Sequence, residues 1–306
     1  MRVTDPITIT DAVLTSSTAA EPGTGETPWA AATSYTVGQE ALVMGSVHAV
    51  YENLIAGVNA TSPELAALGA TPRWLFKRPS NKYAMFDYKR NTVTSVVGAL
   101  TTVFTAGVRL DSVGIIKTNA ETVTLTITLA GVVVYTITAN LRNRFTSGLY
   151  DYFFKPLSTR PNIVFYNLPP YSGAVITVTQ TKSVGNVECG TLMIGPSYFI
   201  GDVQYKAVDD VLNFSLVTRI LDKVTFVAVP NVPKTEQTLT LKKEKLNIAR
   251  TVRTLVGGRP VLWCGIEAQA TNPYYDSLLI SGFYRRFSIN LDNPTGVLVG
   301  LELEEV

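Results

Sequence analysis

The segment Thr122-Val123-Thr124-Leu125-Thr126-Ile127-Thr128-Leu129 decides the fold class, because threonine alternates with an aliphatic residue throughout it. Successive side chains of a β-strand point to opposite faces, so the aliphatic side chains share one face and the threonines share the other. This pattern is typical of a half-buried strand. Ala130-Gly131 then turns the chain into the apolar run 132–138. The two runs therefore predict a β-hairpin.

More β-rich runs follow this hairpin at short intervals. Turn residues such as Pro169-Pro170 and Ser172-Gly173 separate them. Short strands with turn signals at this spacing favour a β-sandwich, which we expect over residues 83–200. The runs lie at 163–166, 174–181 and 188–194.

The region 201–306 combines predicted strands with one helix. Apolar residues recur every three or four positions from Leu246 to Val256, and Gly257-Gly258 follows, so the pattern predicts an amphipathic α-helix that ends there. Strands are expected near 213–219 and 223–229, and at 261–266, 278–287 and 297–303. We therefore expect a C-terminal α+β domain over 201–306.

The first 82 residues predict two smaller parts. Residues 1–28 are rich in Thr, Ser, Ala, Pro and Gly and include the alternating segment Ile7-Thr8-Ile9-Thr10, so we expect an extended arm that pairs with a neighbour, then a linker. Residues 29–82 read as a small β module. The whole chain is thus predicted to be mainly β, with parts at 1–28, 29–82, 83–200 and 201–306.

Composition excludes several classes of protein. Of 306 residues, 46% are hydrophobic and only 16% are charged, which excludes a charge-rich disordered chain. The formal net charge of +2 provides no global field for nucleic acid or an anionic membrane. No apolar run has the length of a membrane span, and the opening residues lack a signal-peptide pattern. We expect no membrane insertion and no specific nucleic-acid partner.

Residues suited to catalysis are scarce. His48 is the one histidine, and it lies in a strand-like run without a nucleophile motif nearby, so a catalytic triad or a His-rich metal site is not expected. The adjacent acids Asp209-Asp210 would point to opposite faces of a strand. Cys189 and Cys264 lie far apart and are expected to be free, buried thiols. The sequence predicts no enzyme, no metal and no cofactor.

Aromatic residues of the small module carry a resemblance to a known family. The order of these residues resembles that in the chitin-binding-type carbohydrate modules of the family 5/12 kind. The residues are Trp29, Tyr35, Val50-Tyr51-Glu52 and Trp74. The resemblance implies a short antiparallel β fold and glycan contacts by Tyr51, Trp29 and Trp74. The segment Leu54-Ile55-Ala56-Gly57 departs from it, because the family usually has sugar-stacking tryptophans there. Core packing of these rings is the alternative.

Three further segments resemble parts of tailed-phage virion proteins, and the region between the first two resembles a galactose-binding-like jelly roll. These segments are 80–87, 195–201 and 281–289. The resemblance implies a structural component of the virion, most simply at the tail tip or baseplate, whose partners are other phage tail or neck proteins. There are three alternatives: a neck or collar protein, a carbohydrate-binding adhesin that contacts host-surface glycans, and an ancillary part of a glycosidase.

Two charged clusters near the C-terminus suggest how copies would assemble. Lys242, Lys243 and Lys245 are predicted on the helix, where they form a basic patch, and Glu302, Glu304 and Glu305 form an acidic one. Two different patches per subunit suit a closed homo-oligomeric ring. Solvated charged faces explain the same residues equally simply. Tyr274 and Tyr275, in a predicted loop, fit either an interface or loop packing.

Overall fold

The computed structural model describes residues 1–143, 148–155, 158–220, 223–227, 229, 231–267, 272–291 and 296–306, with the backbone alone for 216–220 and 223–226. The chain is mainly β, with 48% strand and 11% helix, so the predicted fold class is confirmed. It divides into two compact units, which we call the sandwich unit (Thr8–Leu192) and the C-terminal unit (Met1–Ile7 with Met193–Val306). The finer predicted boundaries stay predictions.

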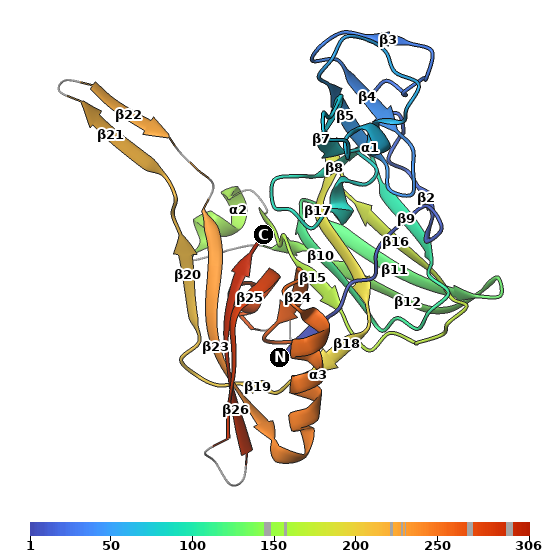
Figure 1. Ribbon diagram of the computed structural model, residues 1–306. Coiled ribbons are helices and arrows are strands. Elements are labelled where there is room, and N and C mark those ends of the chain that lie inside the picture. Colours follow the sequence, from blue (N-terminus) through green and yellow to red (C-terminus); the bar gives the residue numbers. More distant parts are fainter. Residues whose placement is uncertain are drawn as a thin grey trace. The chain divides into compact units, whose positions relative to one another are not determined.

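Two antiparallel sheets dominate the sandwich unit (Figure 1). One has the order β15-β10-β17-β8, and the other the order β12-β11-β16-β9-β2. The strands are β2 (Leu14–Ser17), β8 (Thr94–Val97), β9 (Leu100–Thr105), β10 (Ser112–Thr118), β11 (Thr122–Leu129), β12 (Val132–Asn140), β15 (Ile163–Phe165), β16 (Val175–Thr181) and β17 (Asn186–Gly195). Smaller elements are η1 (Ala84–Phe86), β13 (Arg142–Asn143), α2 (Leu149–Phe154) and β14 (Ser158–Thr159).

The hairpin read from the alternating segment is confirmed. Strands β11 and β12 pair antiparallel, and β16 pairs with the other side of β11. Val123, Leu125 and Ile127 are at most 1% exposed, so the aliphatic face lies in the core. Ala130 and Gly131 both have positive φ, which matches the twist of a two-residue hairpin turn.

A smaller set of strands forms the module, also within the sandwich unit. Its three-stranded sheet has the order β4-β5-β7, and β3 pairs with β6. The elements are β3 (Ser34–Tyr35), β4 (Glu40–Val43), β5 (Ala49–Asn53), β6 (Gly57–Val58), α1 (Pro63–Ala66) and β7 (Trp74–Pro79). Tyr35 and Trp74 meet edge to face, 5.0 Å between ring centroids, in a core too small to form without large rings.

The C-terminal unit is built on one large antiparallel sheet with the order β18-β1-β24-β25-β26-β23-β19, with β20 also paired to β23. The strands are β1 (Arg2–Thr4), β18 (Ser197–Phe199), β19 (Asp202–Val203), β20 (Val208–Leu212), β23 (Val232–Lys242), β24 (Val261–Cys264), β25 (Leu279–Asn290) and β26 (Gly296–Glu305). Strands β21 (Leu216–Ile220) and β22 (Lys223–Val227) form a separate two-stranded sheet. The short helices are η2 (Lys243–Lys245) and η3 (Asp276–Leu278).

Helix α3 (Leu246–Val256) covers the core of this sheet, as its periodicity predicts. Ala249, Val252 and Val256 are fully buried in one cluster with Trp263 and the inward side chains of β23 and β26. Gly257 adopts the left-handed conformation and ends the helix, because a residue without Cβ enters that region readily. Among the described residues, no helix is long and apolar enough to cross a membrane.

The N-terminal residues differ from the expected free arm. β1 lies between β18 and β24 and pairs with both, and Val3 is fully buried. Farther along, β2 pairs with β9 in the sandwich. Ile7-Thr8-Ile9 forms no strand, and Ile9 is 3% exposed. The strands on either side of this segment, Arg2–Thr4 and Leu14–Ser17, therefore pair within the chain.

Candidate functional site

The aromatic residues predicted to contact glycans lie in or against the core of the module. Trp74 is 1% exposed and Tyr51 is 9% exposed, and Trp29 packs against the same cluster. The Tyr51 ring meets Phe76 edge to face at 5.8 Å between centroids. Burial, together with the charge of Glu64, raises the pKa of the Tyr51 hydroxyl. Because sugars stack on exposed ring faces, the positions of these rings favour core packing.

The three lysines of the predicted basic patch are exposed but do not lie on the helix. Lys242 ends β23, and Lys243 and Lys245 belong to η2, so all three precede α3. Helix α3 itself carries two other basic residues, Arg250 and Arg253. The apolar period begins only at Leu246, and the charged run before it forms a separate short turn.

The glutamates of the predicted acidic patch are held by cations of their own sheet. Glu302 lies 2.7 Å from the Nζ of Lys234, which lowers the pKa of the Glu302 carboxyl. Glu304 is 7% exposed and binds the Arg285 guanidinium through both oxygens, one at 3.0 Å. Glu305 is half-buried and ends β26. Much of the negative charge is thus balanced within the chain.

The two patches lie apart on the same pair of strands. Lys242 is opposite Gly296 and Glu236 is opposite Glu302 in the β23–β26 register. Six residues of β23 separate these positions, which corresponds to about 20 Å at 3.3 Å per residue. The structure therefore keeps the predicted basic and acidic residues at different places of one subunit, as a contact between different patches would need.

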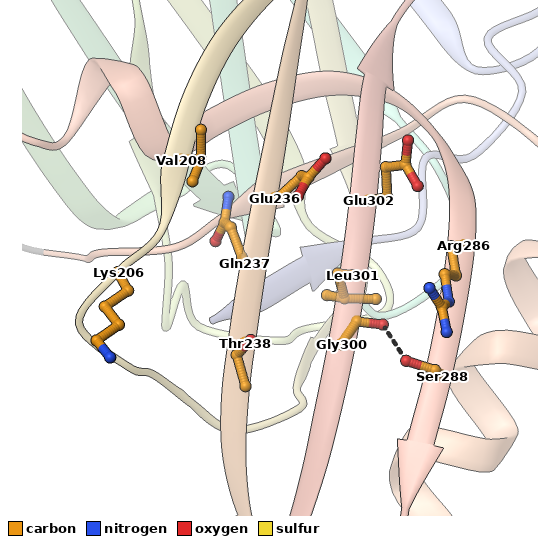
Figure 2. A pocket seen from close by; sticks show the side chains of 10 residues that line it. All are labelled: Lys206, Val208, Glu236, Gln237, Thr238, Arg286, Ser288, Gly300, Leu301 and Glu302. Carbon is orange, nitrogen blue, oxygen red and sulfur yellow. Dashed lines mark hydrogen bonds between the residues drawn. The ribbon is translucent and has the colours of Figure 1, made fainter.

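A polar hollow of about 310 Å³ lies on the face of β23, β25 and β26 (Figure 2). Its lining mixes both charges with hydroxyl groups: Lys206, Val208, Glu236, Gln237, Thr238, Arg286, Ser288, Gly300, Leu301 and Glu302. Ser288 donates to the carbonyl of Gly300 at 3.2 Å, and Lys234 binds both wall glutamates, Glu236 at 3.0 Å and Glu302 at 2.7 Å. The ion pairs tie neighbouring strands together across this face.

The β21–β22 ribbon continues the β20–β23 pair beyond the large sheet (Figure 1). Five residue pairs join its strands, from Leu216 opposite Val227 to Ile220 opposite Lys223. Within the described residues its strands pair only with each other. Apolar side chains near it are strongly exposed: Val208 50%, Val211 48%, Phe214 58%, Val227 51% and Val229 39%. The ribbon thus has two open edges and apolar surface beside it.

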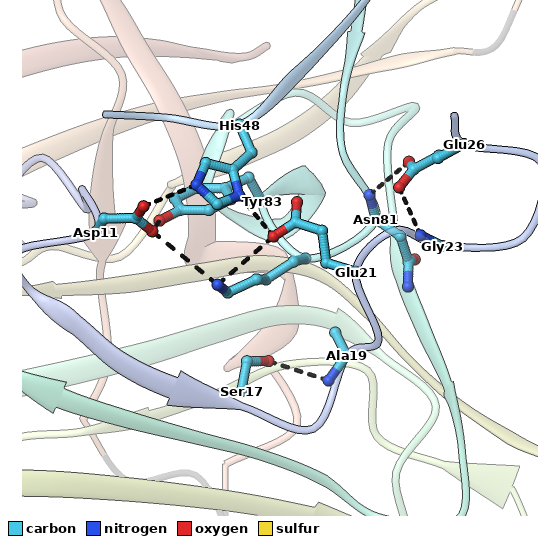
Figure 3. Close-up of polar contacts among 10 residues, drawn as sticks. Asp11, Ser17, Ala19, Glu21, Gly23, Glu26, His48, Asn81 and Tyr83 are labelled. Atoms are coloured by element: carbon cyan, nitrogen blue, oxygen red, sulfur yellow. Dashed lines mark hydrogen bonds and ion pairs between the residues drawn. The ribbon is translucent and has the colours of Figure 1, made fainter. Parts of the chain in front are cut away.

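A group of charged residues in the sandwich unit surrounds His48 (Figure 3). Its Nδ1 lies 2.5 Å from Oε2 of Glu21, and its Nε2 lies 2.7 Å from Oδ2 of Asp11. The Nζ of Lys82 is 3.5 Å from the same Glu21 oxygen. Tyr83 donates to the other Asp11 oxygen at 2.5 Å. We call these five residues the His48 cluster.

Glu26 holds a second buried contact close to the His48 cluster. Its carboxylate side chain is 1% exposed and accepts hydrogen bonds from Arg78 at 3.0 Å, from the backbone N–H of Asn81 at 3.1 Å and from that of Gly23 at 2.8 Å. The segment predicted as a linker is thus attached by two carboxylates, Glu21 and Glu26. The sequence analysis did not predict the contacts of Glu21 and Glu26. The signal for them was the presence of isolated acidic residues in a segment otherwise rich in small residues.

Other residues singled out from the sequence have structural environments. Cys189 and Cys264 are buried thiols outside any disulfide, as predicted, and burial raises the pKa of the Cys189 thiol to about 12. Tyr275 is 3% exposed, which favours loop packing, whereas Tyr274 is 67% exposed. Within the described part of the chain, no three His, Cys, Asp or Glu side chains are placed to hold a metal ion.

Comparison of the chain with protein-family models and with curated proteins found no match. Functional inference therefore rests on the residues and their geometry.

Proposed function

We propose that this chain is a structural protein that assembles with copies of itself through the β21–β22 ribbon, and that it serves in a tailed-phage virion at the tail tip or baseplate. The virion assignment rests on the resemblance of segments 80–87, 195–201 and 281–289 to phage proteins. The proposed assembly rests on the isolated β21–β22 ribbon.

An isolated two-stranded hairpin is marginally stable in water, so a five-pair ribbon outside the main sheet is expected to gain order from a partner. Its two open edges offer backbone donors and acceptors, and a strand is what satisfies such an edge. The sandwich unit offers an open edge of its own in β12, nine residues long and without a charged side chain. A ribbon added to an edge of the next copy makes a heterologous contact, and such contacts close into rings.

The alternatives receive less support. A neck or collar protein would use the same ribbon and is distinguished only by its position in the virion. A carbohydrate-binding adhesin would need exposed rings, and Tyr51 and Trp74 are buried. We expect weak glycan binding at most.

Mass photometry of the full chain tests assembly. In the test variant, Asn-Gly replaces residues 213–231, so that a tight turn joins Leu212 to Val232, which are already opposite each other. We expect the wild type to form closed oligomers and the variant to stay monomeric with unchanged thermal unfolding. The triple variant Lys242→Glu, Lys243→Glu, Lys245→Glu separates a charge-based contact from a ribbon-based one. A monomeric wild type, or a variant that assembles equally well, would refute the ribbon contact.

Electron microscopy of phage particles with this chain labelled tests the location. Label at the tail tip or baseplate is the expected result. Label at the neck would select the alternative, and particles without label would reject a virion role.

A further inference from the structure

The His48 cluster lies where the chain crosses between the module and the sandwich. Asp11 and Glu21 stand on either side of β2, the edge strand that pairs with β9. Lys82 and Tyr83 follow β7, where the chain leaves the module. His48 comes from the module itself, directly before β5. Through its two ring nitrogens, His48 of the module therefore binds the segments before and after the sandwich strand β2.

The hydrogen bonds of His48 require a particular protonation state. Ionised carboxylates accept hydrogen bonds and do not donate them. Because Nδ1 faces Glu21 and Nε2 faces Asp11, both bonds form only when the ring carries both protons. A neutral ring has one N–H, and its other nitrogen would turn a lone pair toward a carboxylate oxygen. Loss of one proton thus replaces an attraction by a repulsion.

Burial strengthens this effect. The side chains of His48 and Glu21 are 6% and 7% exposed, so water screens their charges little. With His48 charged, two cations, His48 and Lys82, balance two anions, Asp11 and Glu21. Proton loss leaves one negative charge in excess.

Asp11 and Tyr83, which bind each other in the cluster, have pKa values that their surroundings shift. Hydrogen bonds from Tyr83 and His48 outweigh burial and lower the pKa of Asp11, so this carboxylate remains ionised in mild acid. Burial and the hydrogen bond to Asp11 raise the pKa of Tyr83, so its hydroxyl stays a donor in mild alkali. The neighbouring Glu26–Arg78 pair, with Glu40 on the other side of Arg78, contains no histidine. His48 is therefore the member of the cluster whose two hydrogen bonds depend on a single ring proton.

We propose that His48 is a pH-dependent contact that fixes the module to the sandwich when its ring is doubly protonated and releases the segment around Asp11 and Glu21 when the ring loses a proton. The Glu26 contact persists, so the release loosens residues 8–22, including the edge strand β2, and leaves the other strands of the sandwich sheets folded. Raising the pH opens the contact.

Hydrogen exchange of the full-length protein at about pH 6 and about pH 9, corrected for the intrinsic rate, measures this opening. In the wild type we expect protection of residues 8–22 to fall about tenfold or more from the lower to the higher pH, because a buried acceptor loses its donor. Protection of residues 122–129 should not change.

Two variants with opposite expectations make the test decisive. His48→Gln supplies one amide in place of two ring N–H groups, so residues 8–22 should be poorly protected at both pH values. Glu21→Gln should stay closed at both, because an amide accepts from a protonated ring nitrogen and donates to a neutral one. Ser17→Ala, which removes only a hydrogen bond to the Ala19 N–H, is the matched control and should retain the wild-type response. Equal protection of the wild type at both pH values, or a wild-type response in Glu21→Gln, would overturn the proposal.

Discussion

The chain contains two antiparallel hairpins, β11–β12 in the sandwich unit and β21–β22 in the C-terminal unit. In the first, β16 pairs with the free side of β11, and the aliphatic face lies in a core. In the second, neither strand has another neighbour within the described residues. Alternation predicts the first hairpin, whereas for the second region the sequence predicts only two strands, near 213–219 and 223–229. The two hairpins differ in how far neighbouring strands and a core bury them. We expect this burial to decide whether a hairpin contributes to stability or to binding.

The largest effect is expected at the best-covered position. Leu125 in β11 is fully buried, so Leu125→Ala should lower the free energy of unfolding of the sandwich unit by about 3–5 kcal/mol, through lost burial and a residual cavity. Chemical denaturation of the full-length protein measures this loss. Thr126→Ala, on the opposite face of the same strand, is the control and should cost much less. Equal losses would mean that the assigned core face is wrong.

A smaller effect is expected on β12, the edge strand of the same sheet. Ile137 pairs opposite Leu125 but is 36% exposed, because β12 has no neighbour on its outer side. Ile137→Ala should cost about 1 kcal/mol, since only part of its surface leaves water on folding. The same denaturation experiment measures it. A loss as large as that of Leu125→Ala would show that β12 is covered in solution, which would itself indicate a partner on this edge.

A substitution in the ribbon should weaken assembly and leave the stability of the monomer nearly unchanged. Val227 is 51% exposed at the end of β22, so Val227→Ser should change the free energy of unfolding of the monomer by no more than about 0.5 kcal/mol. If the ribbon binds a neighbouring copy, the same change should weaken assembly in mass photometry. Val97→Ser, at an 82% exposed position of β8, is the matched control. A variant that is destabilised while its assembly is unchanged would contradict the role of the ribbon.

The sequence predicts features whose cause is local. The turn at Ala130-Gly131 and the end of α3 at Gly257 follow from backbone preferences of a few residues, and both are confirmed. It does not predict that Arg2–Thr4 pairs between β18 and β24, because three residues carry no periodicity and their partners lie almost 200 positions away or more. Tertiary contacts decide such a strand.

The His48 cluster escaped prediction for a related reason. Its members are spread from Asp11 to Tyr83 and share no spacing that a motif would have, so only the folded chain brings them together. Besides the isolated acids of residues 1–28, the signal in the sequence was the presence of a single histidine. The sequence predicts that this histidine is not catalytic, but it does not predict that carboxylates bind both nitrogens of a buried imidazole.

The smallest effect concerns the base of the covered hairpin, where Glu121 precedes β11 and Arg142 follows β12. The Glu121 carboxylate accepts hydrogen bonds from the Arg142 guanidinium and, at 2.8 Å, from the Ser183 hydroxyl, and these bonds lower its pKa below 4.5. A carboxyl whose folded pKa is lowered stabilises the fold above its ordinary pKa, and this stabilisation is lost as the pH falls through the lowered value. Protection of residues 132–142 against hydrogen exchange should therefore decrease below pH 4.5, by a small amount because the Glu121 side chain is partly exposed and its partner Arg142 is exposed. Glu121→Gln should remove most of this acid dependence, whereas Glu236→Gln, in the other unit, should keep it. If Glu121→Gln kept the full dependence, a carboxyl other than Glu121 would be the one that holds the hairpin base, and the contact to Arg142 would not contribute to it.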